Sequence, residues 1–226
     1  MTTMEPLTRT NLRTPKAAAI AGIVFSLLLI VAVGLLRISV PADPSEPGAW
    51  LRTSSNTVAL ALNLVPFAGI AFLWFIGVLR DRLGELEDRF FATVFFGSGL
   101  LFLATLFIAA AVAGGILVAF AAQPEQLINS ATFHFARAAT YAIANIYMIK
   151  VACVFMITTS TVAIFTGFAP RWLALLGYAL SALLLVGSYY ISWSFMLFPL
   201  WVLLISIYIL IDNILRPPSG EVTLGR

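Results

Sequence analysis

The sequence is poor in charge and in the side chains that build catalytic and metal sites. Charged residues make up 10% of the 226 residues, whereas a soluble protein has about 25%. The single cysteine, Cys153, excludes an intrachain disulfide and a cysteine-rich metal site. The single histidine, His134, excludes a site built from several histidines of this chain, and a glycine-rich nucleotide-binding motif is absent. We therefore expect no haem, metal or flavin cofactor and no enzyme activity.

Hydrophobic residues, by contrast, are abundant. They account for 61% of the chain, and the mean hydropathy is +1.01. A soluble domain of 24.5 kDa could not bury that much apolar surface, so we expect the lipid bilayer to cover part of it. The net charge is only +3, and the basic residues lie in short loops and tails. This distribution is typical of topology signals and predicts no nucleic-acid binding.

Long uncharged stretches predict the fold class. A transmembrane helix needs about 20 mostly apolar residues, because about 30 Å of hydrocarbon must be crossed. The sequence therefore predicts an all-α integral membrane protein, a single membrane domain that forms a bundle of six transmembrane helices. The last two helices depend on a break at Ser192–Ser194 within a long uncharged stretch, and five spans is the competing count. The expected spans are 17–37, 57–79, 90–120, 138–166, 172–191 and 195–215, with tails at 1–16 and 216–226.

The basic residues between the spans predict the orientation, since lysine and arginine are enriched in cytoplasmic loops. One side carries Arg9, Arg13, Lys16, Arg80, Arg82, Arg89, Arg171, Arg216 and Arg226, and the other side carries Arg37, Arg52 and Arg137. We expect both termini in the cytoplasm, with the chain in the inner (plasma) membrane of the cell. Residues 38–52, which contain three prolines, should form an irregular external loop. Residues 121–136 should form a second external loop with a short interfacial turn around Phe133–Phe135.

Lys150 is the one charge deep inside an expected span. A lysine there costs about 2.5–3.5 kcal/mol on insertion scales, so we expect it to have a partner. Asp212 on the last span is the best partner, and Asn63, Asn145 and Asn213 are neutral alternatives. The functional interpretation is a substrate, ion or proton site. The structural interpretation is a buried pair that sets the helix register, or a lysine that extends to the inner surface.

Two prolines and a hydroxyl cluster lie within the expected spans. Pro66 and Pro199 should each kink their helix, and a carbonyl freed beside Asn63 could coordinate an ion, although such kinks also serve shape alone. The side chains at 158–161, Thr-Thr-Ser-Thr, should each bond the backbone carbonyl one turn back.

Two functions stay open at this point. One is a non-catalytic accessory or scaffold subunit, whose partners are the lipid bilayer and other membrane protein subunits or further copies of the chain. The other is a small ion or solute transporter or channel, with Lys150, Asp212 and Asn63 along its path. A single internal charge makes a sparse path, so we favour the subunit.

Overall fold

The computed structural model describes residues 14–83, 89–187 and 193–215. These residues form helices joined by short turns, with no strand among them. Five of the described helices are long and apolar enough to cross a membrane, and a sixth is apolar but shorter. The expected all-α membrane bundle is confirmed. The helices are α1 (Thr14–Ser39), η1 (Gly48–Trp50), α2 (Leu51–Leu83), α3 (Arg89–Ala122), α4 (Pro124–Leu127), α5 (Ala131–Ala142), η2 (Ile143–Tyr147), α6 (Met148–Thr166), α7 (Arg171–Gly187), η3 (Ser194–Met196) and α8 (Leu197–Leu215).

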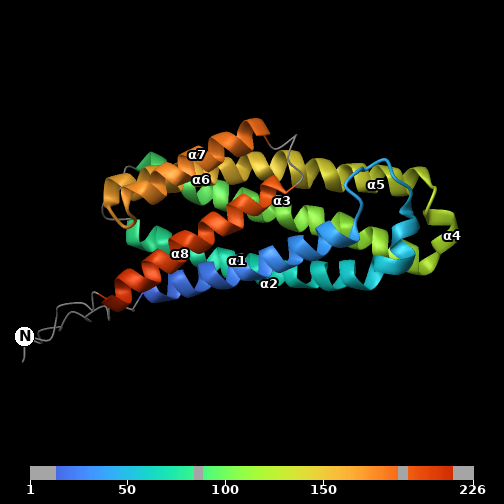
Figure 1. Ribbon diagram of the computed structural model, residues 1–226, viewed down its shortest axis with the longest axis horizontal. Helices are drawn as coiled ribbons and strands as arrows, with labels where there is room; N and C mark the ends of the chain where they lie inside the picture. The colour runs from blue at the N-terminus through green and yellow to red at the C-terminus, as the bar shows by residue number, and fades with distance from the viewer. Residues whose placement is uncertain (1–13, 84–88, 188–192, 216–226) are drawn as a thin grey trace, which may run out of the picture.

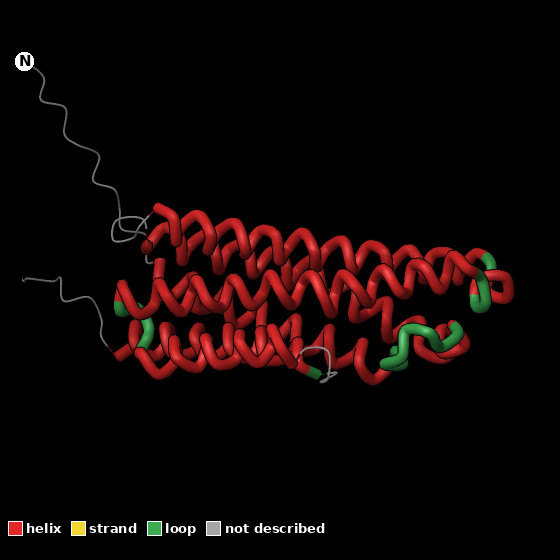
Figure 2. Tube along the Cα trace, turned by 90° about the horizontal axis from the view of Figure 1, so that it is seen from above, coloured by secondary structure: helices red, strands yellow, loops and turns green. Residues whose placement is uncertain are grey.

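The helices lie side by side along one long axis (Figure 1), and a second direction shows the same elongated bundle (Figure 2). α1 packs on α2 and α8, α3 packs on α2 and α6, and α7 packs on the outside of α6. The start of α1 and the end of α8 lie at the same end of the bundle (Figure 1). The opposite end, called the loop end here, is formed by residues 40–50 and 123–130. The tails 1–13 and 216–226 lie outside the described residues.

Three helical runs are much longer than a bilayer is thick. α2 has 33 residues, α3 has 34, and α5, η2 and α6 form one run over Ala131–Thr166. Each run is about 50 Å long at the rise of an α-helix, against about 30 Å of hydrocarbon. The α5–η2–α6 run ends at Gly167, whose φ of 69° belongs to the left-handed region that glycine adopts without strain. α3 therefore contains the predicted span 90–120, and the α5–η2–α6 run contains the predicted span 138–166.

Two helix starts differ from the predictions. The expected interfacial turn around Phe133–Phe135 is wrong, because these residues form the first turns of α5. Ser130 caps this helix by accepting a hydrogen bond from the Phe133 N–H at 3.1 Å. α2 likewise begins at Leu51 instead of 57, through a stretch of polar residues. Polar side chains reduce the apolar signal of a span without preventing a helix, so hydropathy alone places both starts too late.

α7 and α8 are shorter than α1, α2, α3 and the continuous α5–η2–α6 run. α7 has 17 residues and its described part ends at Gly187, so the predicted end of the fifth span at 191 lies outside the described residues. α7 ends and α8 begins about midway along the bundle, whereas α3 and α5 continue to the loop end (Figure 1). The half of the bundle toward the loop end is therefore built from α1, α2, α3 and the α5–η2 run.

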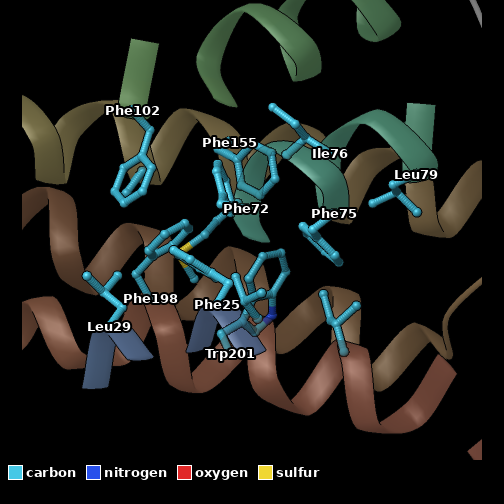
Figure 3. Packing of buried hydrophobic residues seen from close by; sticks show 14 of the residues in the cluster. Phe25, Leu29, Phe72, Phe75, Ile76, Leu79, Phe102, Phe155, Phe198 and Trp201 are labelled. Carbon is cyan, nitrogen blue, oxygen red and sulfur yellow. The ribbon is translucent and has the colours of Figure 1, made fainter. Parts of the chain in front are cut away.

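A cluster of phenylalanines joins five helices at the centre of the bundle (Figure 3). Phe72 of α2 lies 4.5 Å from Phe25 and 5.2 Å from both Phe102 and Phe155, measured between ring centroids. Phe198 of α8 lies 4.7 Å from Phe102. All five side chains are fully buried. Each such pair contributes about 0.5–1.5 kcal/mol beyond its buried area, so this cluster holds α1, α2, α3, α6 and α8 together.

Glycines permit two close helix crossings. A Cβ at Gly177 of α7 would collide with the Ser160 hydroxyl and the Trp201 ring. A Cβ at Gly22 of α1 would collide with the Ser206 hydroxyl and the Phe75 ring. Small residues that let backbones approach are the usual means of helix association in lipid, where the hydrophobic effect between helices is weak.

The hydroxyl cluster at 158–161 behaves as predicted at three of its four positions. Thr158, Thr159 and Thr161 donate to the carbonyls of Val154, Phe155 and Ile157 at 2.9, 2.7 and 2.8 Å. The prediction is wrong for Ser160, whose hydroxyl packs against the backbone of Gly177 and has no hydrogen-bond partner among the described residues.

The two prolines occupy different places in their helices. Pro66 lies inside α2, and the helix continues through it. Pro199 lies in the first turn of α8, where backbone N–H groups have no partner within the helix. Its missing N–H therefore costs no helical hydrogen bond, and Pro199 starts α8 rather than interrupting it.

Candidate functional site

Lys150 has a backbone partner. Its ammonium donates a hydrogen bond to the carbonyl of Leu185, near the end of α7. The last four carbonyls of a helix have no partner within the helix, and a cation there is favoured by the helix dipole. The described part of α7 ends at Gly187, so this bond predicts that Lys150 caps the end of α7.

The other polar residues singled out in the sequence are not gathered around Lys150. Among the described residues, one ion pair joins two side chains, and it is Arg52–Glu125. The predicted ion pair between Lys150 and Asp212 is therefore not formed. Asp212 lies in the last turn of α8, and Asn63 is exposed on the surface of α2. The side chain of Asn213 lies outside what the structure describes.

Asn145 takes part in a different polar group. It lies in η2, a single π-helical turn that interrupts the α5–α6 run, and such turns are frequent at functional sites. Its side-chain oxygen accepts a hydrogen bond from Nη2 of Arg37 at 2.9 Å, and its amide nitrogen donates to the Tyr141 carbonyl at 3.1 Å. Arg37, at the end of α1, therefore turns toward the interior of the bundle.

Arg37 and Asn145 line a cavity in the half of the bundle toward the loop end. The cavity lies between α1, α2, α3 and the α5–η2 run, and about 200 Å³ of it is open to water-sized molecules. Small side chains leave this space, because α3 presents alanine at three of the lining positions. The walls are mainly apolar and include Leu29, Ala32, Val65, Ala109, Ala113 and Phe195.

Arg137 forms the polar end of the cavity together with Trp50. The side chain of Arg137 is 6% exposed, and its Nη2 donates to the carbonyls of Pro41 and Asp43 at 2.9 and 2.6 Å. Its guanidinium carbon lies 5.5 Å from the centre of the Trp50 ring, a cation–π arrangement. Nη1 of Arg137 and Nε1 of Trp50 are both buried without a hydrogen-bond partner among the described residues. Two neighbouring side chains therefore each carry a buried donor without an acceptor among the described residues.

The loop that Arg137 binds is held in place by further contacts. The N–H of Gly48 donates to the Ile128 carbonyl at 3.2 Å. The carboxylate of Asp43 accepts from the N–H and hydroxyl of Ser45 at 2.8 and 2.7 Å, and these bonds lower the pKa of Asp43. The predicted irregular loop is thus ordered from Val40 to Pro47, followed by η1.

The lining combines two arginines with mainly apolar walls. Its charged groups are Arg37 and Arg137, and it includes no acidic residue, histidine or cysteine. Among the described residues no group of three such side chains is placed to hold a metal ion. A set of donors facing apolar walls can orient a ligand that has one polar and one apolar end.

Sequence reasoning missed Arg37, Arg137 and Trp50, because it treated the arginines as markers of the external side. Their position at the ends of uncharged stretches shows where the membrane boundary lies but not which way the side chains turn. Comparison with models of known protein families, with curated proteins and with solved structures finds no match. The cavity is therefore interpreted from its own chemistry.

Proposed function

We propose that this chain is a non-catalytic membrane protein that binds a lipid-like molecule in the cavity between α1, α2, α3 and η2. The observation that carries this proposal is the apolar space of about 200 Å³ inside the described bundle. An apolar cavity of about 150 Å³ is large enough to bind benzene. A bound apolar group would gain packing contacts with the cavity walls.

The accessory-subunit hypothesis is compatible with this function. The outer face of α2 exposes Leu60, Phe67, Ile70 and Trp74. This apolar face suits lipid or the helix of another membrane protein equally well. The transporter hypothesis has less support, since the ammonium of Lys150 is bound to a carbonyl of α7 and does not line the cavity.

The proposed location is the inner membrane, with both termini in the cytoplasm. Support comes from the sequence, in which the predicted topology assigns nine basic residues to the side of the termini and three to the opposite side. In this orientation the cavity and its arginines belong to the external half of the bundle.

A neutral photoactivatable long-chain alcohol tests the proposed binding. The full chain in mild detergent should show saturable labelling of the α3 segment around Ala113, which excess unlabelled alcohol suppresses. Labelling of Trp74 on the outer face of α2 should not saturate, because detergent and probe exchange freely there.

Two variants with the same added side chain sharpen the test. Ala113→Phe places a ring in the cavity and should abolish the saturable labelling, whereas Ala111→Phe places the same ring on the exposed face of α3 and should leave it unchanged. Saturable labelling that survives Ala113→Phe at wild-type level would contradict the proposal.

A further inference from the structure

We infer that the polar end of the cavity binds an anionic headgroup, so that the ligand is a single-chain amphiphile with a carboxylate or phosphate. This inference rests on the proposed function, because it assumes that the cavity holds a ligand. The donor end, as we call it, consists of Arg137, Trp50 and Arg37, all of which line the cavity.

The two unpartnered donors show what kind of atom is missing. Arginine and tryptophan side chains donate hydrogen bonds and accept none. Nη1 of Arg137 and Nε1 of Trp50 are both buried without a partner among the described residues, and the guanidinium lies over the indole ring. Buried donors are almost always satisfied in folded proteins. The group that completes this site is therefore an acceptor that both donors can reach.

The balance of charge at the donor end favours a negative group. Arg137 is nine-tenths buried, yet its described hydrogen bonds go to two backbone carbonyls and not to a carboxylate. Asp43 and Glu46 are the acidic residues that act on Arg137 through their charge, and both are exposed on the loop outside the cavity lining. A buried cation is costly without a counter-charge.

Arg37 adds a second guanidinium to the same lining. It donates to the Asn145 oxygen through Nη2, which fixes its direction toward the cavity. Guanidinium groups present several donors in one plane and match the oxygen pairs of carboxylate and phosphate groups.

The remaining walls determine the rest of the ligand. Apart from the donor end, the lining is mainly apolar and includes Ala32, Ala109, Val65 and Phe195. A free inorganic anion would leave these walls uncovered, and a neutral hydrocarbon would leave the two donors without an acceptor. An amphiphile with one anionic end and one alkyl chain satisfies both parts of the site.

The experiment compares probes that differ only in their headgroup. The delipidated full-length chain in a neutral detergent is titrated with dodecanoate, dodecyl phosphate, dodecanol and dodecyltrimethylammonium, each competing with the photoactivatable alcohol. We expect the two anions to compete at least tenfold more tightly than dodecanol and the cation to compete least. The stronger of the two anions distinguishes a fatty-acid ligand from a lipid phosphate.

Trp50→Phe is the decisive variant, because it removes one N–H and keeps an aromatic ring beneath Arg137. It should weaken binding of the preferred anion about threefold to tenfold and weaken dodecanol less, because a neutral hydroxyl oxygen accepts a weaker hydrogen bond than an anionic oxygen. Arg137→Gln should weaken the anion more strongly, but it also removes the bonds to Pro41 and Asp43 and can disturb the loop. Arg52→Gln is the matched control, since Arg52 is an exposed arginine at the same end, paired with Glu125 outside the cavity lining.

The outcomes separate the two proposals. If dodecanol competes as tightly as the anions, or if Trp50→Phe weakens both equally, the donor end does not select a negative headgroup, and the inference is overturned while ligand binding stands. If none of the probes competes and the alcohol shows no saturable labelling, the proposed function fails together with the inference.

Discussion

Replacing Lys150 tests whether this lysine serves as a helix cap or as half of an ion pair. Lys150→Met keeps the length of the side chain and removes the hydrogen bond to the Leu185 carbonyl. When the bundle unfolds in detergent, its helices separate but Lys150 stays in an apolar environment. The cost of desolvating its ammonium is therefore the same in the folded and the unfolded protein. The difference in stability is then the loss of the capping bond.

The size of that loss follows from measured hydrogen bonds. A bond from a charged donor contributes about 1.5–3 kcal/mol in soluble proteins, whereas polar contacts between membrane helices average about 0.6 and reach about 1.7 kcal/mol. We therefore expect Lys150→Met to lower the free energy of unfolding by about 1 kcal/mol. Amide exchange in the last turn of α7 should be about fivefold faster, since the cap acts there.

A double-mutant cycle with Asp212→Asn completes the assay. Because Lys150 and Asp212 form no ion pair, the two effects on the free energy of unfolding should add to within about 0.5 kcal/mol. Thermal or denaturant unfolding of the wild type, both single variants and the double variant in one detergent gives the four values. A coupling above about 1 kcal/mol would mean that the two side chains do interact. Unchanged exchange at the end of α7 in Lys150→Met would refute the capping role.

Two further predictions concern packing and topology. Gly177→Ala should lower the free energy of unfolding by about 1–3 kcal/mol, because the added methyl group would collide with Ser160 and Trp201. Gly97→Ala, at an open helical position, should leave the free energy of unfolding unchanged or raise it by about 0.5–1 kcal/mol. Equal effects of the two variants in denaturant unfolding would contradict the close α6–α7 crossing. In a Cys153→Ala background, an impermeant thiol reagent applied to intact cells should label Ala49→Cys and should label Glu5→Cys only after permeabilisation. The reverse pattern would invert the proposed orientation.

The fold class could be predicted from the sequence because membrane spans depend on the length of uncharged apolar stretches, which can be read directly along the chain. Uncharged stretches of sufficient length indicate helices that lipid can surround, and α3 follows its stretch closely, ending at Ala122. The starts of α2 and α5 were placed too late because their first turns carry polar side chains. A cap such as Ser130 is visible in the sequence, but many serines in loops look the same.

The site could not be predicted, because it depends on the direction in which individual side chains turn, and the composition of the sequence does not indicate that direction. Arg37 and Arg137 turn inward to an amide oxygen and to backbone carbonyls. Lys150 likewise bonds a backbone carbonyl, whereas sequence reasoning can propose only side chains as partners. The π-helical turn that places Asn145 has no sequence signature of its own. The cavity is lined by side chains from separate helices, and no single stretch of the sequence contains it.

An experimental density map of the chain purified in mild detergent, without added ligand, tests the central claim most directly. The account predicts elongated density in the cavity, running from near Phe195 to the donor end, with its polar end within hydrogen-bond distance of Nη1 of Arg137 and Nε1 of Trp50. Extraction and mass spectrometry of the same sample should identify the molecule as an anionic single-chain amphiphile. A cavity filled by ordered water alone, or closed by movement of α3 toward α1, would contradict the account.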